Sequence, residues 1–133
     1  MPVLTLKLVE PVDQERAQQA TVLLTNLTAT ILRKKRELTA VIIEPVQADL
    51  WSIGGVTMSD TKLATFALDI KVTQGTNTPS EKAAYVKAVF DGMQTLLGPL
   101  QAASYVIIGE VEAAAWGYGG RTQADRFAAQ AGS

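Results

Sequence analysis

The sequence contains one pattern twice, at an offset of 65 residues. Residues 41–55 read VIIEPVQADLWSIGG, and residues 106–120 read VIIGEVEAAAWGYGG. A Val-Ile-Ile run, a tryptophan and a glycine pair coincide in this single register, which indicates an internal duplication. We therefore expect one domain over 1–133, built from a first repeat at 2–55, a polar linker at 56–63 and a second repeat at 64–133.

The first repeat predicts strand, helix, strand. Leucines alternate with polar residues over 4–8, as in a strand with one buried face. Asp13 is placed to cap a helix that runs to about Arg33 with apolar residues at helical spacing. Residues 38–46 then predict a buried, β-branched strand.

The second repeat predicts the same order. Apolar residues alternate over 66–72, residues 78–81 form a capping box with proline at the first helical position, and residues 104–111 predict a second buried strand. The fold class is therefore α/β (α+β): tandem β-α-β repeats forming a four-stranded sheet with two helices on one face. The uncovered face of such a sheet predicts an oligomer.

The amino-acid composition excludes several kinds of catalytic site, metal site and binding partner. The 133 residues include no histidine and no cysteine, which excludes imidazole and thiolate nucleophiles, the corresponding metal sites and disulfides. A net charge of −1 argues against nucleic acid or an anionic membrane as a partner. No signal peptide or membrane-spanning run is readable, so we expect a cytoplasmic protein that uses no metal and no cofactor.

Pro2 is the first candidate catalytic residue. Methionine is usually removed when a small residue follows it, and removal would leave a free prolyl amine. Such an amine is a base that needs no histidine, and burial beside cations would lower its pKa toward neutrality. The alternative is an ordinary Met-Pro start that merely opens a strand.

Pro2 at the head of an alternating strand, followed by a helix, a Val-Ile-Ile strand and the Trp-Ser-Ile-Gly-Gly segment at 51–55, resembles the tautomerase superfamily typified by 4-oxalocrotonate tautomerase. The second half, which has no starting proline, resembles the C-terminal half of longer members such as malonate semialdehyde decarboxylase. The resemblance implies an isomerase, a keto-enol tautomerase in which Pro2 moves a proton between the oxygen and carbon of an enol 2-oxo acid such as 2-hydroxymuconate. It also implies that Trp51 forms a wall of the substrate pocket.

The resemblance leaves the substrate-binding cations open, because the family's two arginines fall on Val12 and Ala40. Arg36 is the first choice for a carboxylate contact, although the basic run 33–36 could simply complement a helix C-terminus. Tyr105 is the duplicate of Ala40 and could donate a hydrogen bond to an enolate, or could serve as an interface tyrosine.

Two further functions fit the same sequence. A decarboxylase or hydratase/dehalogenase would need an acid, and Glu110 and Glu112 share one strand face. A non-catalytic oligomeric homologue would account for the missing arginines. Since the family's short subunit forms hexamers, a fused chain is expected to form a homotrimer, with a small molecule as its only other partner.

Overall fold

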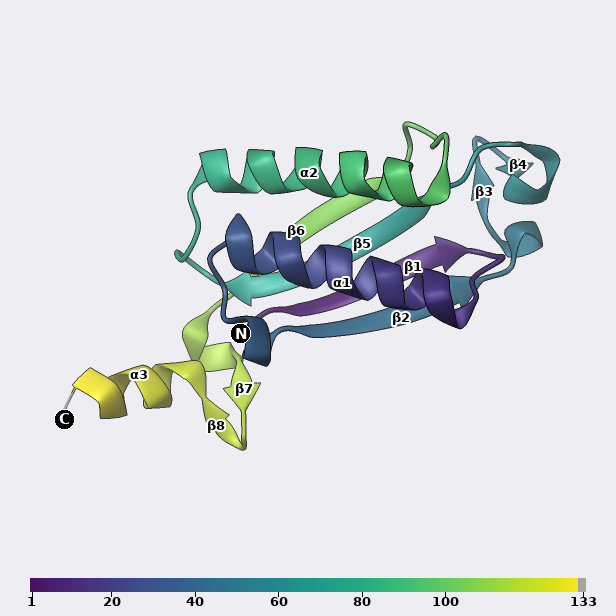
Figure 1. Cartoon of the computed structure of the whole chain (residues 1–133). Coiled ribbons are helices and arrows are strands. Elements are labelled where there is room, and N and C mark those ends of the chain that lie inside the picture. The colour runs from purple at the N-terminus through teal and green to yellow at the C-terminus, as the bar shows by residue number, and fades with distance from the viewer. Residues whose placement is uncertain (132–133) are drawn as a thin grey trace.

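The computed structural model describes residues 1–131 and shows two helices packed on one face of a four-stranded sheet (Figure 1). The main elements are β1 (Val3–Val9), α1 (Gln14–Thr30), β2 (Ala40–Val46), β5 (Phe66–Thr73), α2 (Pro79–Leu97) and β6 (Tyr105–Val111). The predicted fold class, tandem β-α-β repeats with both helices on one face, is confirmed.

Short elements follow the second strand of each repeat. After β2 come η2 (Ala48–Leu50), β3 (Ser52–Ile53), β4 (Val56–Thr57) and η3 (Met58–Asp60). After β6 come η4 (Ala113–Ala115), β7 (Gly117–Tyr118), β8 (Arg121–Thr122) and α3 (Gln123–Ala131), and a further turn, η1 (Arg36–Leu38), precedes β2. Each glycine pair sits at a hairpin tip with positive φ, 61° and 80° in the first repeat and 59° and 81° in the second. Glycine adopts this backbone at no steric cost, so the duplicated pair marks a duplicated turn.

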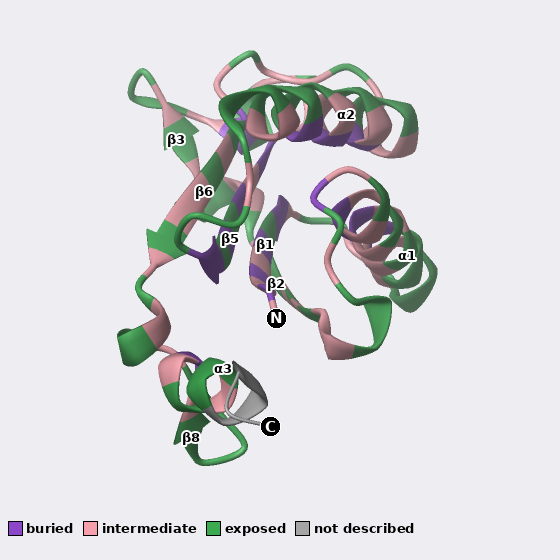
Figure 2. Cartoon of the chain, turned by 90° about the vertical axis from the view of Figure 1, so that its left-hand side faces the viewer, coloured by how far each residue is buried: buried purple, intermediate pink, exposed green. Residues whose placement is uncertain are grey.

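The strand order is β2-β1-β5-β6. Strands are parallel within each repeat, as the crossover helices predict, while β1 and β5 pair antiparallel at the centre. Leucines 4, 6 and 8 and the alternating residues of β5 are almost completely buried. Figure 2 shows buried residues on β1 and β5 and on the helices that cover them. Each such side chain contributes about 1.5–3 kcal/mol when it is buried.

The Val-Ile-Ile strands were predicted to be buried, and that prediction is wrong. β2 and β6 are the two edges of the sheet, where Ile42 remains 49% and Ile107 57% exposed. The physical reason is the central pairing, because each repeat joins the other through its first strand and leaves its second strand with one neighbour. Their alternate residues, Val41, Ile43, Val106 and Ile108, still pack against the core.

Local signals locate the helix starts. Asp13 Oδ1 accepts a hydrogen bond from the backbone N–H of Arg16 at 2.8 Å, and Thr78 with Glu81 forms the predicted capping box. The first helix ends at Thr30, earlier than the expected Arg33, whose φ of 58° lies in the left-handed region. Within residues 1–131, no helix combines the length and apolar content needed to cross a bilayer.

The antiparallel centre decides which segments meet. Val3 pairs with Lys71 near the end of β5, so the chain start lies beside the end of the second repeat. Figure 1 accordingly places α3, β7 and β8 at the end of the sheet where the N-terminus lies, with β3 and β4 at the opposite end.

Candidate active site

The start of β1 lies beside a cavity of about 340 Å³. Met1 lines this cavity, and Pro2, the next residue in the chain, is buried, with its carbonyl accepting a hydrogen bond from the Ala40 N–H at 3.1 Å. The remaining lining comes from the loop after α1, the end of β5 with the turn that follows it, and α3: Arg33, Lys34, Lys35, Leu38, Thr73, Thr76, Gln123, Arg126 and Phe127. We call this the N-terminal cavity. Removal of Met1 would bring the nitrogen of Pro2 to its wall.

The lining is strongly cationic. It includes four basic side chains, those of Arg33, Lys34, Lys35 and Arg126, and no carboxylate among the described residues that form it. Like charges gathered around one space repel one another, so the arrangement favours an anion in the cavity.

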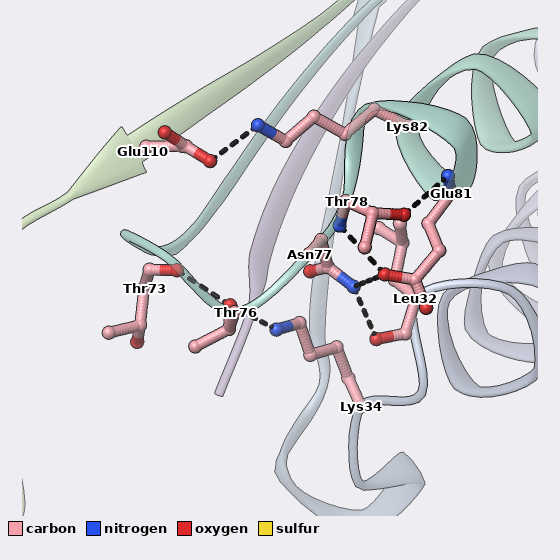
Figure 3. Close-up of polar contacts among 9 residues, drawn as sticks. All are labelled: Leu32, Lys34, Thr73, Thr76, Asn77, Thr78, Glu81, Lys82 and Glu110. Carbon is pink, nitrogen blue, oxygen red and sulfur yellow. Dashed lines mark hydrogen bonds and ion pairs between the residues drawn. The ribbon is translucent and has the colours of Figure 1, made fainter.

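Lys34 is held in the wall by a chain of two hydrogen bonds (Figure 3). Its Nζ donates to Thr76 Oγ1 at 2.7 Å, and Thr76 Oγ1 donates to the carbonyl of Thr73 at 2.6 Å. Because the single hydroxyl proton of Thr76 goes to Thr73, the hydroxyl oxygen is left to accept from the lysine. Two of the three ammonium protons of Lys34 remain for other acceptors.

A second set of contacts ties the same loop to the start of α2 (Figure 3). Asn77 Nδ2 donates to the carbonyl of Leu32 at 2.9 Å, and Arg33 Nε pairs with Glu81 Oε2 at 2.7 Å. The pKa of Glu81 is lowered to about 2, chiefly by the hydrogen bond from the backbone N–H of Thr78; desolvation opposes this effect, and Arg33 and Asn77 add to it. The loop carrying Lys34 is thus anchored on both sides.

Burial and charge both act on the amines of the cavity. Burial lowers the pKa of the chain's terminal amine, and the charges of Lys34, Arg126 and Lys35 lower it further. Burial also lowers the pKa of Lys34, with Glu81 opposing and Arg33 reinforcing that change. An amine in this position therefore loses its proton more readily than an exposed amine, which is what a base requires.

Arg126 enters the cavity from α3 in the second repeat. Its guanidinium carbon lies 4.5 Å from the centroid of the Tyr118 ring, and Nη1 donates to the sulfur of Met1 at 3.2 Å. Phe127 follows it and supplies the apolar part of the same wall. One cavity is therefore built from both repeats.

We compared the chain with protein-family models and with curated proteins. The family model described as tautomerase enzyme matches residues 67–126. Residues 67–126 of the chain are thus similar to tautomerase enzymes. This match covers most of the second repeat, while Pro2 lies in the first. Comparison with curated proteins gives no match.

Solved structures share the fold of this chain over most of its length. A native fused 4-OT is 21% identical, with 92% of this chain and 97% of that chain covered and a TM-score of 0.80. A fused 4-OT described as an asymmetric trimer is 19% identical, with 93% and 98% covered and a TM-score of 0.81. A macrophage migration inhibitory factor-like protein from Entamoeba histolytica is 15% identical, with 91% and 97% covered and a TM-score of 0.75. The predicted resemblance to fused, two-repeat members of the tautomerase superfamily is confirmed by the family match over 67–126 and by the shared fold.

The predicted site residues fall in two places. Arg36 lies at the same end as Pro2, but its guanidinium donates to Asn26 Oδ1 on α1 and it does not line the cavity. Trp51 follows β2, and Tyr105 begins β6 opposite Ala67, which puts both at the far end of the sheet. Within one chain neither aromatic residue reaches Pro2, so their roles stay predictions that require a neighbouring copy.

The cavity contains cations that the sequence reading did not select. Lys34 belongs to the basic run 33–36 from which Arg36 was chosen, and the other three members of that run line the cavity. Arg126 lies in the alanine-rich tail, 124 residues after Pro2. The internal duplication was the sequence signal that could have indicated Arg126. When two repeats pair antiparallel through their first strands, the end of the second repeat lies beside the start of the first.

The two acidic residues considered for decarboxylase or hydratase activity lie outside the N-terminal cavity. Glu110 forms an ion pair with Lys82 (Figure 3), and Glu112 lies in the exposed stretch after β6. Neither residue lines the N-terminal cavity.

Proposed function

We propose that the chain is a keto-enol tautomerase, an isomerase in which the amine of Pro2, freed by removal of Met1, acts as general base and then general acid on an enol 2-oxo acid. The observation that carries this proposal is the position of Pro2, a buried residue that directly follows Met1, which lines a cavity together with four basic residues. A 2-hydroxymuconate-like substrate supplies the anionic groups that such a wall would bind.

The reaction follows from the same geometry. A neutral prolyl nitrogen takes the proton of the enol hydroxyl, the oxygen becomes a carbonyl, and the displaced electron pair takes that proton back from nitrogen at carbon. No atom is gained or lost. Burial and neighbouring cations lower the pKa of the terminal amine at Met1, and the same effects would favour the neutral, basic form of the Pro2 amine once Met1 is removed. The same cations hold the carboxylates while charge moves along the substrate.

We further infer that the chain functions as a homo-oligomer, and specifically a trimer. Fused 4-OT proteins of the same fold are described as symmetric and asymmetric trimers. Exposed apolar side chains on both edge strands of this chain support the inference. Assembly would also let Trp51 and Tyr105, at one end of the sheet, approach the N-terminal cavity of a neighbouring copy.

Two measurements test the assignment. The intact mass should correspond to a chain without Met1, because a retained methionine would convert the Pro2 nitrogen to an amide and rule the mechanism out. Ketonisation of 2-hydroxymuconate at pH 7 should then exceed the uncatalysed rate and fall about 100-fold in Pro2→Ala, within the range typical of general acid–base catalysis. The exposed Pro99→Ala is the matched control.

Alternative chemistry would give a different pattern. Release of carbon dioxide or hydration of the substrate in the same assay would favour the decarboxylase or hydratase branch and would direct attention to Glu110 and Glu112. Equal rates for wild type, Pro2→Ala and buffer would favour a non-catalytic homologue.

A further inference from the structure

The second repeat has alanine at position 67, where the duplication would align a proline, yet it contributes to the cavity beside Pro2. Its contribution is Arg126, a half-buried residue on α3. Among residues 1–131, Arg126 forms no ion pair, and its contacts are the ring of Tyr118 and the sulfur of Met1.

These contacts fit a residue that binds a ligand better than one that holds the fold. A thioether sulfur is a weak acceptor, and this partner is lost when Met1 is removed. The three other cations of the cavity disfavour a further positive charge. An aromatic ring can hold a guanidinium by its face while leaving the planar N–H groups at its edge free for a carboxylate.

Arg126 and Lys34 reach the cavity from separate supports. Lys34 comes from the loop after α1 and is held by Thr76, whereas Arg126 comes from α3 and is held by Tyr118 on β7. Two independently held cations in one cavity match a small molecule with two anionic groups.

We propose that Arg126, positioned by the ring of Tyr118, is the specificity-determining residue that binds one carboxylate of a dicarboxylate substrate in the site of the other repeat. This inference rests on the proposed function for the identity of the reaction, while the binding role of Arg126 stands apart from it. The second repeat thereby completes the first repeat's site within one chain.

The test compares the binding of adipate, a dicarboxylate, with that of hexanoate, its monocarboxylate counterpart, by calorimetry on the Met1-trimmed protein. Arg126→Gln should weaken adipate at least 10-fold and hexanoate no more than about twofold, because hexanoate can still use Lys34. Arg121→Gln, an exposed residue outside the cavity lining, is the matched control and should change neither. An unchanged adipate-to-hexanoate ratio in Arg126→Gln would overturn the proposal.

Two variants of Tyr118 test whether its aromatic ring positions Arg126. Tyr118→Phe keeps the ring and should bind adipate like the wild type, whereas Tyr118→Leu removes it and should weaken adipate severalfold with hexanoate unaffected. Equal losses in the two variants would mean that the ring does not position Arg126. Circular dichroism of each variant confirms that α3 is intact.

A kinetic arm distinguishes this inference from the proposed function. Arg126→Gln should raise KM for 2-hydroxymuconate more than for 2-hydroxypenta-2,4-dienoate, which lacks the distal carboxylate, with kcat for the monoacid little changed. If Pro2→Ala has no effect but Arg126→Gln still loses adipate, the catalytic assignment fails and the dicarboxylate site stands. If Pro2→Ala abolishes activity while Arg126→Gln affects dicarboxylates and monocarboxylates equally, the catalytic assignment stands and the proposed role of Arg126 fails.

Discussion

At the scale of single residues, the site depends on side chains that are positioned by neutral partners. Lys34 is held by a threonine hydroxyl whose own proton is committed to a backbone carbonyl. A neutral acceptor orients the ammonium group and leaves its positive charge in place, whereas a carboxylate partner would neutralise that charge. The positive potential beside Pro2 is therefore preserved for an anion.

The contact between Lys34 and Thr76 yields the first prediction. Thr76→Val removes the acceptor and should weaken adipate binding about threefold to tenfold, the usual worth of one hydrogen bond. Thr76→Ser retains the hydroxyl and should bind like the wild type. Calorimetric titration of both variants checks this, and a Ser variant as weak as the Val variant would contradict it.

Tyr85 yields a second prediction, on stability. Its hydroxyl lies 2.8 Å from Thr28 Oγ1 between the two main helices, and burial raises the pKa of Tyr85 to about 12 against the opposing effect of this hydrogen bond. A phenol whose pKa is raised by folding stabilises the protein fully below its unfolded pKa of about 10. That contribution should fall by about 1.4 kcal/mol per pH unit as the pH rises from 10 to 12.

Tyr85→Phe separates the two effects. At pH 7 it should lower the free energy of unfolding by about 1–2 kcal/mol, because Thr28 loses its partner. Between pH 10 and 12 the variant should lose less stability than the wild type, so the difference should shrink. Urea unfolding at a series of pH values measures this, with the exposed Tyr105→Phe as control, and a gap that stays constant with pH would argue against ionisation of Tyr85.

At the scale of elements, the start of α2 fixes the loop that carries Lys34. Glu81 accepts from the backbone N–H of Thr78 at 2.8 Å inside the capping box and pairs outward with Arg33. One carboxylate thus closes a helix end and ties down the segment after α1. This arrangement explains why a basic turn next to the cavity stays ordered despite its charge.

The low pKa of Glu81 sets the third prediction. Because its pKa is depressed from 4.5 to about 2, Glu81 stabilises the fold above pH 4.5, and that contribution is lost as the pH falls toward 2. Glu81→Gln keeps a capping-box side chain but removes the charge. The variant should be less stable than the wild type at pH 7 and approach it at pH 2.5. Acid titration followed by circular dichroism checks this, with the exposed Glu37→Gln expected to leave the profile unchanged.

At the scale of the whole molecule, the sheet ends in two strands built for further contacts. Ile42 and Ile107 occupy equivalent positions on β2 and β6 and are about half exposed. Unpaired backbone groups and apolar side chains on a sheet edge favour pairing with another chain. The two edges give one chain two such surfaces, in keeping with the trimer inferred above.

The fourth prediction concerns that assembly. Ile42→Lys together with Ile107→Lys should yield a monomer, because charged edges oppose strand pairing. Light scattering measures the mass, and Val22→Lys, a 47% exposed position on α1, is the control that should leave the oligomer intact. An unchanged oligomer in the double variant would place the interface away from the strand edges.

Local sequence by itself determined the elements of this protein. Alternating leucines define β1, Asp13 and the capping box at Thr78 start the helices, and the duplicated glycine pairs mark the hairpins. These signals involve neighbours within a few residues, so they can be read without knowing where the chain goes next. Pro2 was selected in the same way, from its place at the head of a strand.

The tertiary structure alone decided which elements meet. The antiparallel pairing of β1 with β5 placed the Val-Ile-Ile strands at the edges, put Tyr105 at the end of the sheet away from Pro2, and brought Arg126 to the N-terminal cavity. The parallel pairing of β1 with β2 put Trp51 at that same far end. The physical reason is that an alternating sequence only requires one face of each strand to be buried under the helices. Several different strand orders meet that requirement equally well. Local periodicity therefore determines which face of a strand is buried, whereas packing of the whole sheet determines its neighbours.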